Sequence, residues 1–347
     1  PVLALYPGLV DAFLAFPGFP GLPETAFDPA ALPPFLARVQ GEHHDLAVQL
    51  HGNGMLTNAF VQLLGARDTA GHFLPAVQRP QGDGLWLEYP GRGHEIRRLL
   101  GLVRFLGAPD DGEDLPLAPD PAHRAGVLDL LAGEGVRADR LAVVHAGASD
   151  PDRRWPASRF AAVAHSLAAL GFDVVLTGSR HEGATTAAVL HAAGAGVHDL
   201  TGKTGLGTLA ELLHLARVLV SNDTGVSHLA VATATPSVVV FSRPERERWA
   251  PLDSDLHRAV GPSVARPGAT GPTLREPAVC PSADCTPTGR SDLGDRCLRD
   301  ACRLASGVEH VEGPPTATVL REVARLLQDL RTRRGLPDAV PSHARPA

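Results

Sequence analysis

The sequence contains one methionine and one lysine in 347 residues. The methionine is Met55, so position 1 is not a translation start, and we expect a processed product, a trimmed form or a fragment. The lysine is Lys203, and arginine supplies every other basic position apart from histidine. A single lysine between Gly202 and Thr204 indicates either chance or a need for a compact ammonium group at that point.

An excess of positive charge and long apolar runs are also absent. The formal net charge is −6, which gives no electrostatic basis for binding nucleic acid. No uninterrupted apolar stretch reaches the length of a membrane span. Residues 1–6 lack the basic head and apolar core of a secretion signal. We therefore expect a cytoplasmic protein of two domains, with peripheral contact at the inner face of the membrane left open.

Cysteine is scarce and confined to one segment rich in proline and glycine. The four cysteines are Cys280, Cys285, Cys297 and Cys302. They form two pairs of equal spacing, which is compatible with a four-thiolate zinc site, although each pair is wider than the usual zinc knuckle. In a cytosolic chain the same residues can be plain reduced thiols. The sequence leaves both interpretations open.

From Leu141 onward, strand and helix signals alternate regularly. Runs rich in valine and leucine predict strands at residues 141–145, 173–177, 197–200, 217–221 and 237–241. Apolar residues at helical spacing predict intervening helices across residues 160–167, 182–193 and 206–215, and from residue 226. Continuous apolar strands that alternate with helices are typical of a parallel sheet covered on both faces, the doubly wound α/β class.

The first part of the chain is similar in kind but weaker. It predicts a strand at residues 45–50 and helices at residues 56–64 and 94–106. Residues 107–114, followed by Pro116, Pro119 and Pro121, look like an exposed connection between domains. An amphipathic helix is predicted at residues 316–330. We divide the chain into a domain at 1–120, a domain at 121–312 with the cysteine-bearing loop 261–305, a helix at 313–332 and a disordered tail at 333–347.

The segment most indicative of a ligand is residues 221–228, with the sequence SNDTGVSH. It follows a predicted buried strand and opens directly into a helix. Such a junction presents free backbone N–H groups and the positive end of the helix dipole, which favour phosphate. Three more turns, at residues 145–149, 177–180 and 201–204, follow strands of the same predicted sheet and share its edge.

Basic side chains accompany these turns. Those that could balance a diphosphate without a metal are Arg153, Arg154, Lys203 and His228. Each feature alone has a structural alternative: Asp223 and Thr224 can simply cap a helix. Competing motifs fail, because a P-loop would need glycine where Val197 stands and no Gly-x-Ser-x-Gly elbow is present. Four polar turns on one sheet edge favour a nucleotide-diphosphate ligand.

An ordered series of motifs carries a family resemblance. The series runs through residues 145–149 (HAGAS), 154–156 (RWP), 176–178 (LTG), 199–204 (DLTGKT) and 221–225 (SNDTG), and continues through 228–230, 235–236 and 249–251. It resembles glycosyltransferase family 9, the ADP-heptose:lipopolysaccharide heptosyltransferases. The resemblance is close over residues 141–251 and looser over residues 45–106.

This resemblance implies a GT-B architecture, in which two Rossmann-like doubly wound domains face each other across a cleft. The C-terminal domain would hold the sugar nucleotide and the N-terminal domain the acceptor, with the last helix packing back at the junction. The implied donor-binding residues are Ser149, Arg153, Arg154, Glu182, Lys203, Thr204, Asp223, Thr224, Gly225 and His228. The loop before Trp155 is one residue longer than in some relatives, so the basic contact falls to either Arg153 or Arg154.

The sequence departs from the family at its start. Family members begin with a strand that leads into a turn containing glycine and an aspartate, which is thought to be the general base. No such pattern precedes Asp45. We therefore expect the first domain to be truncated by one strand–helix unit, and the catalytic base to lie upstream of Pro1.

The resemblance thus implies an inverting glycosyltransferase that needs neither metal nor cofactor. It would move a heptose from ADP-heptose onto a lipopolysaccharide-like or other cell-envelope saccharide, so its partners would be a nucleotide-diphosphate sugar and a lipid-linked or envelope acceptor. Two alternatives stay open. One is a sugar-nucleotide-binding protein without transferase activity, and the other is a different GT-B enzyme such as a sugar-nucleotide epimerase.

Overall fold

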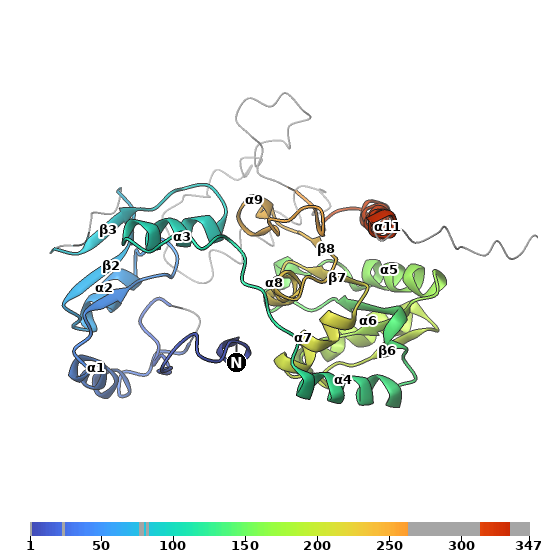
Figure 1. The fold of residues 1–347 in the computed structure, drawn as a ribbon, viewed down its shortest axis with the longest axis horizontal. Coiled ribbons are helices and arrows are strands. Elements are labelled where there is room, and N and C mark those ends of the chain that lie inside the picture. The colour runs from blue at the N-terminus through green and yellow to red at the C-terminus, as the bar shows by residue number, and fades with distance from the viewer. Residues whose placement is uncertain (1, 23–24, 76–79, 81–82, 263–312, 334–347) are drawn as a thin grey trace, which may run out of the picture. The chain divides into compact units, whose positions relative to one another are not determined.

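The computed structural model describes residues 2–22, 25–75, 80, 83–262 and 313–333. The chain divides into two compact units, Pro1–Leu115 and Pro116–Ala347. Each unit contains a parallel β-sheet accompanied by helices, as Figure 1 shows. The predicted fold class, an α/β protein with two Rossmann-like units of the GT-B kind, is therefore confirmed. The domain boundary predicted at residue 120 lies one residue before α4 (Pro121–Gly133).

The first unit has a three-stranded sheet in the order β1-β2-β3. Both strand pairs are parallel. Its elements are η1 (Val2–Leu5), α1 (Leu32–Gly41), β1 (Leu46–Val48), α2 (Thr57–Leu63), β2 (Asp68–Phe73), β3 (Leu85–Glu88) and α3 (Glu95–Phe105).

The second unit has a six-stranded parallel sheet in the order β6-β5-β4-β7-β8-β9. After α4 its elements are η2 (Ala138–Arg140), β4 (Leu141–His145), η3 (Pro151–Arg153), α5 (Ala157–Ala169), β5 (Asp173–Leu176), η4 (Arg180–Glu182), α6 (Gly183–Ala193), β6 (Val197–Asp199), α7 (Leu206–Leu215), β7 (Val218–Asn222), α8 (Gly225–Ala232), β8 (Ser237–Val240), α9 (Arg246–Trp249), β9 (His257–Val260) and α11 (Thr316–Arg333). This order is that of the Rossmann fold, and the direction of winding reverses between β4 and β7.

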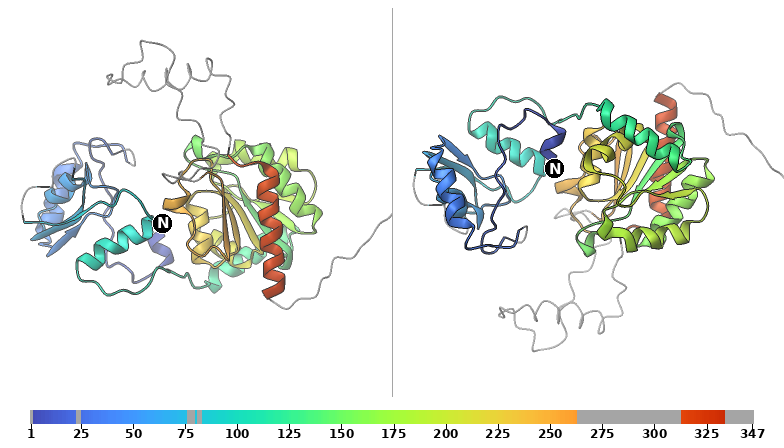
Figure 2. Two further views of the ribbon diagram at one scale, coloured as in Figure 1. Left: turned by 90° about the horizontal axis from the view of Figure 1, so that it is seen from above. Right: turned by 90° about the horizontal axis from the view of Figure 1, so that it is seen from below.

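The sheet of the second unit is buried on both faces, as its continuous apolar strands require. β7 and β8 are buried at every position. One face packs against α5, α6 and α11, with Val144, Val220 and Val238 among the contributing strand residues. Figure 2 shows α11, in red, running beside the sheet. The indole Nε1 of Trp155 donates to the carbonyl oxygen of Pro314, at 2.9 Å, and so ties the start of α5 to the chain that leads into α11.

Two expectations about the connections are corrected. The predicted exposed linker does not extend through Pro121, which is the first residue of α4. Asp120 caps that helix, because its carboxylate accepts from the backbone N–H of Ala122 at 2.8 Å, and proline is well tolerated in the first turn of a helix. The last helix continues beyond its predicted end at residue 330, to Arg333, so the tail predicted from residue 333 begins inside a helix.

Other sequence predictions fall outside the described residues. Residues 263–312 contain all four cysteines, so neither the zinc interpretation nor the thiol interpretation is addressed by the structure. Residues 334–347 of the predicted tail are likewise not described. Among the helices of the described ranges, none has the length and apolar character needed to cross a bilayer.

A buried histidine at the amino end of β9, His257, gives the first testable prediction. Burial lowers the pKa of His257 to about 4, against a weaker opposing effect of Asp253, and Ser237 Oγ lies 2.8 Å from its Nδ1. The unfolded chain binds this proton near pH 6.5 and the folded chain only near pH 4. The free energy of unfolding should therefore decrease as pH falls through this window, by about 1.5 kcal/mol between about pH 6.5 and 5.

Urea unfolding at a series of pH values measures this dependence. His257→Asn, which has no titrating side chain, should reduce the pH slope of the unfolding free energy whatever its effect on the absolute value. Equal slopes in the wild type and the variant would contradict the assignment to His257.

Candidate functional site

The point at which the winding of the second sheet reverses is where ligands bind in doubly wound folds. β4 and β7 lie side by side here, with His145 opposite Ser221 at their carboxyl ends. The loop after β4 leads to α5, and the short turn after β7 leads to α8. These two connections form the floor of the candidate site, and they contain half of the residues predicted from sequence.

Asn222 joins the two connections. Its Oδ1 accepts from the backbone N–H of Trp155 at 2.9 Å, and its Nδ2 donates to the carbonyl oxygen of Ala146 at 2.8 Å. The side chain is fully buried. Asn222 was not among the predicted site residues, although it lies inside the SNDTG motif. The available signal was an amide at the end of a buried apolar strand, where a polar side chain needs partners.

The start of α8 is exposed, and unpaired hydroxyl oxygens lie just before it, at Thr224 and at Ser221 in β7. Thr224 precedes the helix with an extended backbone (φ −147°, ψ 178°), and Gly225 is the first helical residue. A Cβ placed on Gly225 would meet no atom within 4 Å. Among the described residues, the hydroxyls of Thr224 and Ser221 are buried without a hydrogen-bond partner. Because the first N–H groups of a helix also lack partners within it, this junction is suited to an anion.

Arg153 and Asp223 meet at this junction. Arg153 Nη1 lies 3.4 Å from Asp223 Oδ2, and its Nη2 lies 2.9 Å from Glu245 Oε2. Burial raises the pKa of the Asp223 carboxyl to about 6, while Arg153 lowers it and Glu245 raises it further. Arg154 turns the other way, since its Nε donates to the carbonyl oxygen of Ala148 at 2.7 Å. Of the two arginines left open by the sequence, Arg153 is the one that reaches the Asp223 turn.

Glu182 lies at the same sheet edge, with its carboxylate used locally. Its Oε2 accepts from the backbone N–H of Ser179 at 2.6 Å, and the two residues form a reciprocal capping box. A Cβ on Gly147 would meet the Glu182 carboxylate, so a larger residue at position 147 would require this side chain to shift. His145 lies close to the Glu182 carboxylate. Burial lowers the pKa of His145, with Glu182 opposing this, and its Nδ1 lies 3.0 Å from Thr177 Oγ1.

The remaining predicted residues are Ser149, Lys203, Thr204 and His228. Lys203 and Thr204 follow β6, and the ammonium of Lys203 pairs with Glu134 at the end of α4, at 2.5 Å. Ser149 is exposed in the loop after β4. His228 is exposed on α8, where its ring centroid lies 6.0 Å from that of Trp249. The described residues contain no group of three or more His, Cys, Asp or Glu side chains that could hold a metal ion.

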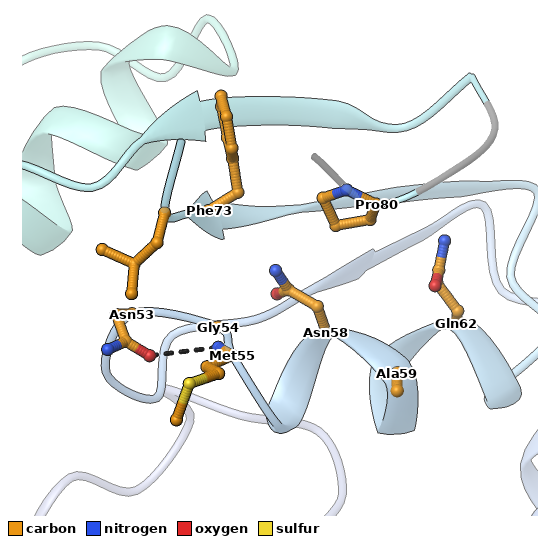
Figure 3. Close-up of a pocket in the computed structure, with 9 residues that line it drawn as sticks. Asn53, Gly54, Met55, Asn58, Ala59, Gln62, Phe73 and Pro80 are labelled. Atoms are coloured by element: carbon orange, nitrogen blue, oxygen red, sulfur yellow. Dashed lines mark hydrogen bonds between the residues drawn. The ribbon is translucent and has the colours of Figure 1, made fainter. Parts of the chain in front are cut away.

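The first unit has a separate pocket of about 200 Å³ between α2 and the end of β2. Its lining is uncharged and consists of Asn53, Gly54, Met55, Asn58, Ala59, Gln62, Phe73, Leu74 and Pro80. Figure 3 shows the Asn58 amide pointing from α2 into this space. Asn58 Nδ2 donates to the carbonyl oxygen of His72 at 2.8 Å, while its buried Oδ1 has no partner among the described residues. The pocket therefore suits a neutral group that can donate a hydrogen bond.

Comparison with known proteins gives a family match for the second unit. Residues 107–264 match the model of glycosyltransferase family 9 (heptosyltransferase). Lipopolysaccharide heptosyltransferase 2 of Salmonella typhimurium (strain LT2) is 32% identical over 167 residues, which are 45% of this chain and 48% of that protein. Lipooligosaccharide heptosyltransferase 2 of Haemophilus influenzae (strain Rd) is 28% identical over 172 residues, 46% of this chain and 49% of that protein. The chain thus matches about half the length of these curated relatives.

Solved structures resemble this one over a larger part of the chain. A glycosyl transferase family 9 protein from Veillonella parvula DSM 2008 has a TM-score of 0.64 at 18% identity, covering 86% of this chain and 78% of the other. The ADP-heptose lps heptosyltransferase II of E. coli has a TM-score of 0.52 at 20% identity, covering 67% and 72%. At these identities the likeness establishes the fold.

Proposed function

We propose that this protein, which is like the heptosyltransferases of glycosyltransferase family 9, transfers a sugar from a nucleotide-diphosphate sugar to a saccharide acceptor. The proposed donor is ADP-heptose, and the proposed acceptor is a lipopolysaccharide-like or other cell-envelope saccharide. Support for the transferred sugar and for the acceptor comes from two relatives, which are named lipopolysaccharide heptosyltransferase 2 and lipooligosaccharide heptosyltransferase 2.

The observation that carries the proposal is the start of α8 at the winding reversal. Three features favour a diphosphate there: the open helix N-terminus at Gly225, the unpartnered hydroxyls of Ser221 and Thr224, and the guanidinium of Arg153. Helix N–H groups and arginine both bind phosphate oxygens through charge-assisted hydrogen bonds. Asp223 adds an acceptor for the hydroxyls of the sugar.

In the proposed reaction, an acceptor hydroxyl oxygen attacks the anomeric carbon from the side opposite the diphosphate. The bond from that carbon to the phosphate oxygen breaks, and the nucleoside diphosphate leaves with both electrons of the bond. The α8 N-terminus and Arg153 stabilise the charge that develops on the leaving group. The proton of the acceptor passes to a base that we do not assign among the described residues. The uncharged pocket beside Asn58 is our candidate for acceptor contacts.

Product analysis tests the transfer. The protein is incubated with ADP-heptose and a core oligosaccharide acceptor, and released ADP and the acceptor mass are followed together. Stoichiometric ADP and a mass increase of one heptose support transfer. Donor binding without either product would favour the sugar-nucleotide-binding alternative. Conversion of the donor sugar in the absence of acceptor would favour an epimerase.

The raised pKa of Asp223 leads to a second prediction, for donor binding. Above about pH 6 the ionised carboxylate repels the diphosphate, and below it the carboxyl is neutral. The affinity for ADP-glucose, whose diphosphate charge is constant over this range, should increase about fivefold from about pH 7.5 to 5. Calorimetric titration measures it. Asp223→Asn should lose most of this pH dependence, and an unchanged profile in that variant would assign the dependence to another group.

A further inference from the structure

Arg153 is held by two carboxylates that differ in accessibility. The side chains of Arg153 and Glu245 are both 30% exposed, and their shortest N···O distance is 2.9 Å. Asp223 is 5% exposed, and its distance to Arg153 is 3.4 Å. The closer and more exposed carboxylate is therefore Glu245, which lies just before α9. Asp223 is the fixed partner, because it is buried at the end of β7.

A second arginine joins the same two segments of the chain. Arg243 lies three residues after β8, and its guanidinium pairs with Asp150 at 3.0 Å and Asp152 at 2.5 Å. Ion pairs thus join the loop after β4 to the segment after β8, and each segment supplies one arginine. Arg153 of the first pairs with Glu245 of the second, and Arg243 of the second pairs with the two aspartates of the first. Partly exposed ion pairs of this kind each contribute little to the free energy of folding, so one of them can be broken with little loss of stability.

A diphosphate and a carboxylate compete for the same guanidinium. Both present paired oxygens that match the planar fork of arginine. A diphosphate seated at Gly225 would bring two negative charges close to Glu245 and Asp223, which already surround Arg153. Unless the Glu245 carboxylate moves away, its repulsion of the diphosphate opposes binding.

We propose that Glu245 is a positioning residue. Its carboxylate pairs with the Arg153 guanidinium in the donor-free protein, and the donor's diphosphate replaces it there on binding. The inference rests on the proposed function, because it takes Arg153 as a donor contact. Glu245 holds the guanidinium extended toward the α8 N-terminus when no donor is present. It also competes for Arg153 while a nucleotide is bound, and so accelerates the departure of the nucleotide product.

The test uses Glu245→Gln, with Glu247→Gln as a matched control. Glu247 lies in α9, which begins directly after Glu245, is exposed, and undergoes the same change of charge. Binding of ADP is measured by calorimetry, and its dissociation by stopped-flow displacement. Glu245→Gln should bind ADP about tenfold more tightly, mainly through slower dissociation. Glu247→Gln should differ from the wild type by less than about twofold.

A double-mutant cycle shows whether the effect passes through Arg153. When Arg153 is already alanine, Glu245→Gln should change the ADP affinity by less than about twofold. If Glu245→Gln tightened ADP binding equally in the wild type and in Arg153→Ala, Glu245 would act by repelling the diphosphate and not by competing for Arg153. That result would overturn the inference. So would unchanged or weaker ADP binding by Glu245→Gln when the wild type binds, and the proposed function would then still stand. No ADP binding by any of these proteins would overturn the proposed donor site and the inference together.

Discussion

Arg153→Ala is expected to weaken the binding of ADP by about 100-fold. The variant removes the guanidinium that would make charge-assisted hydrogen bonds to the diphosphate. It also leaves Asp223 buried without its counter-charge, so the negative potential at the start of α8 increases. Calorimetric titration at about pH 7.5, where Asp223 is ionised, gives the difference directly.

Arg154→Ala is the matched control for this prediction. It changes the same charge in the same loop, but Arg154 is directed at the carbonyl oxygen of Ala148 instead of the Asp223 turn. Its ADP affinity should fall by less than about threefold. Equal losses in the two variants would contradict the assignment of the diphosphate contact to Arg153 and would indicate a general electrostatic effect.

The second large effect is expected on stability. Asn222→Ala should lower the free energy of unfolding of the second unit by about 3 kcal/mol. The variant leaves the N–H of Trp155 and the carbonyl of Ala146 without their partner in a fully buried position, and it disconnects the loop after β4 from the end of β7. Urea unfolding followed by circular dichroism measures the change.

Ser221, which precedes Asn222 and is equally buried, provides the control. Its hydroxyl has no partner among the described residues. Ser221→Ala should therefore change the unfolding free energy by less than about 0.5 kcal/mol. If Asn222→Ala cost no more than Ser221→Ala, the proposed role of Asn222 in joining the two loops would be wrong.

The elements with a clear apolar period could be predicted from sequence. The strand predicted at residues 141–145 and the helix predicted at 206–215 coincide with β4 and α7. β2 was missed because its sequence, DTAGHF, has a glycine and a histidine where the pattern calls for branched apolar residues. Their burial depends on neighbours: Gly71 admits the side chains of Gln49 and Trp86, and His72 packs on the ring of Tyr89. Such contacts leave no periodic signal in the sequence.

For the site, the sequence could predict where the turns lie but not which side chains meet. Strand ends and helix starts follow from local pattern, so the turn at residues 221–228 was found. Asp223 and Glu245 are 70 and 92 residues from Arg153 along the chain. Glu134 is 69 residues from Lys203, and only the packed sheet brings these partners together. The choice between Arg153 and Arg154, and the pairing of Lys203 with Glu134, were therefore beyond sequence reasoning.

The two hydrogen bonds of Trp155 have a spectroscopic consequence. Its backbone N–H is held by Asn222 at the site, and its buried indole N–H is held by the carbonyl that precedes α11. Of the three tryptophans, Trp86 belongs to the first unit, and Trp155 and Trp249 belong to the second. With the latter two replaced by phenylalanine, all remaining tryptophan emission comes from Trp86. Fluorescence can then follow the first unit alone, and Trp155 retained as the single emitter reports on the loop after β4, where we propose that the donor binds.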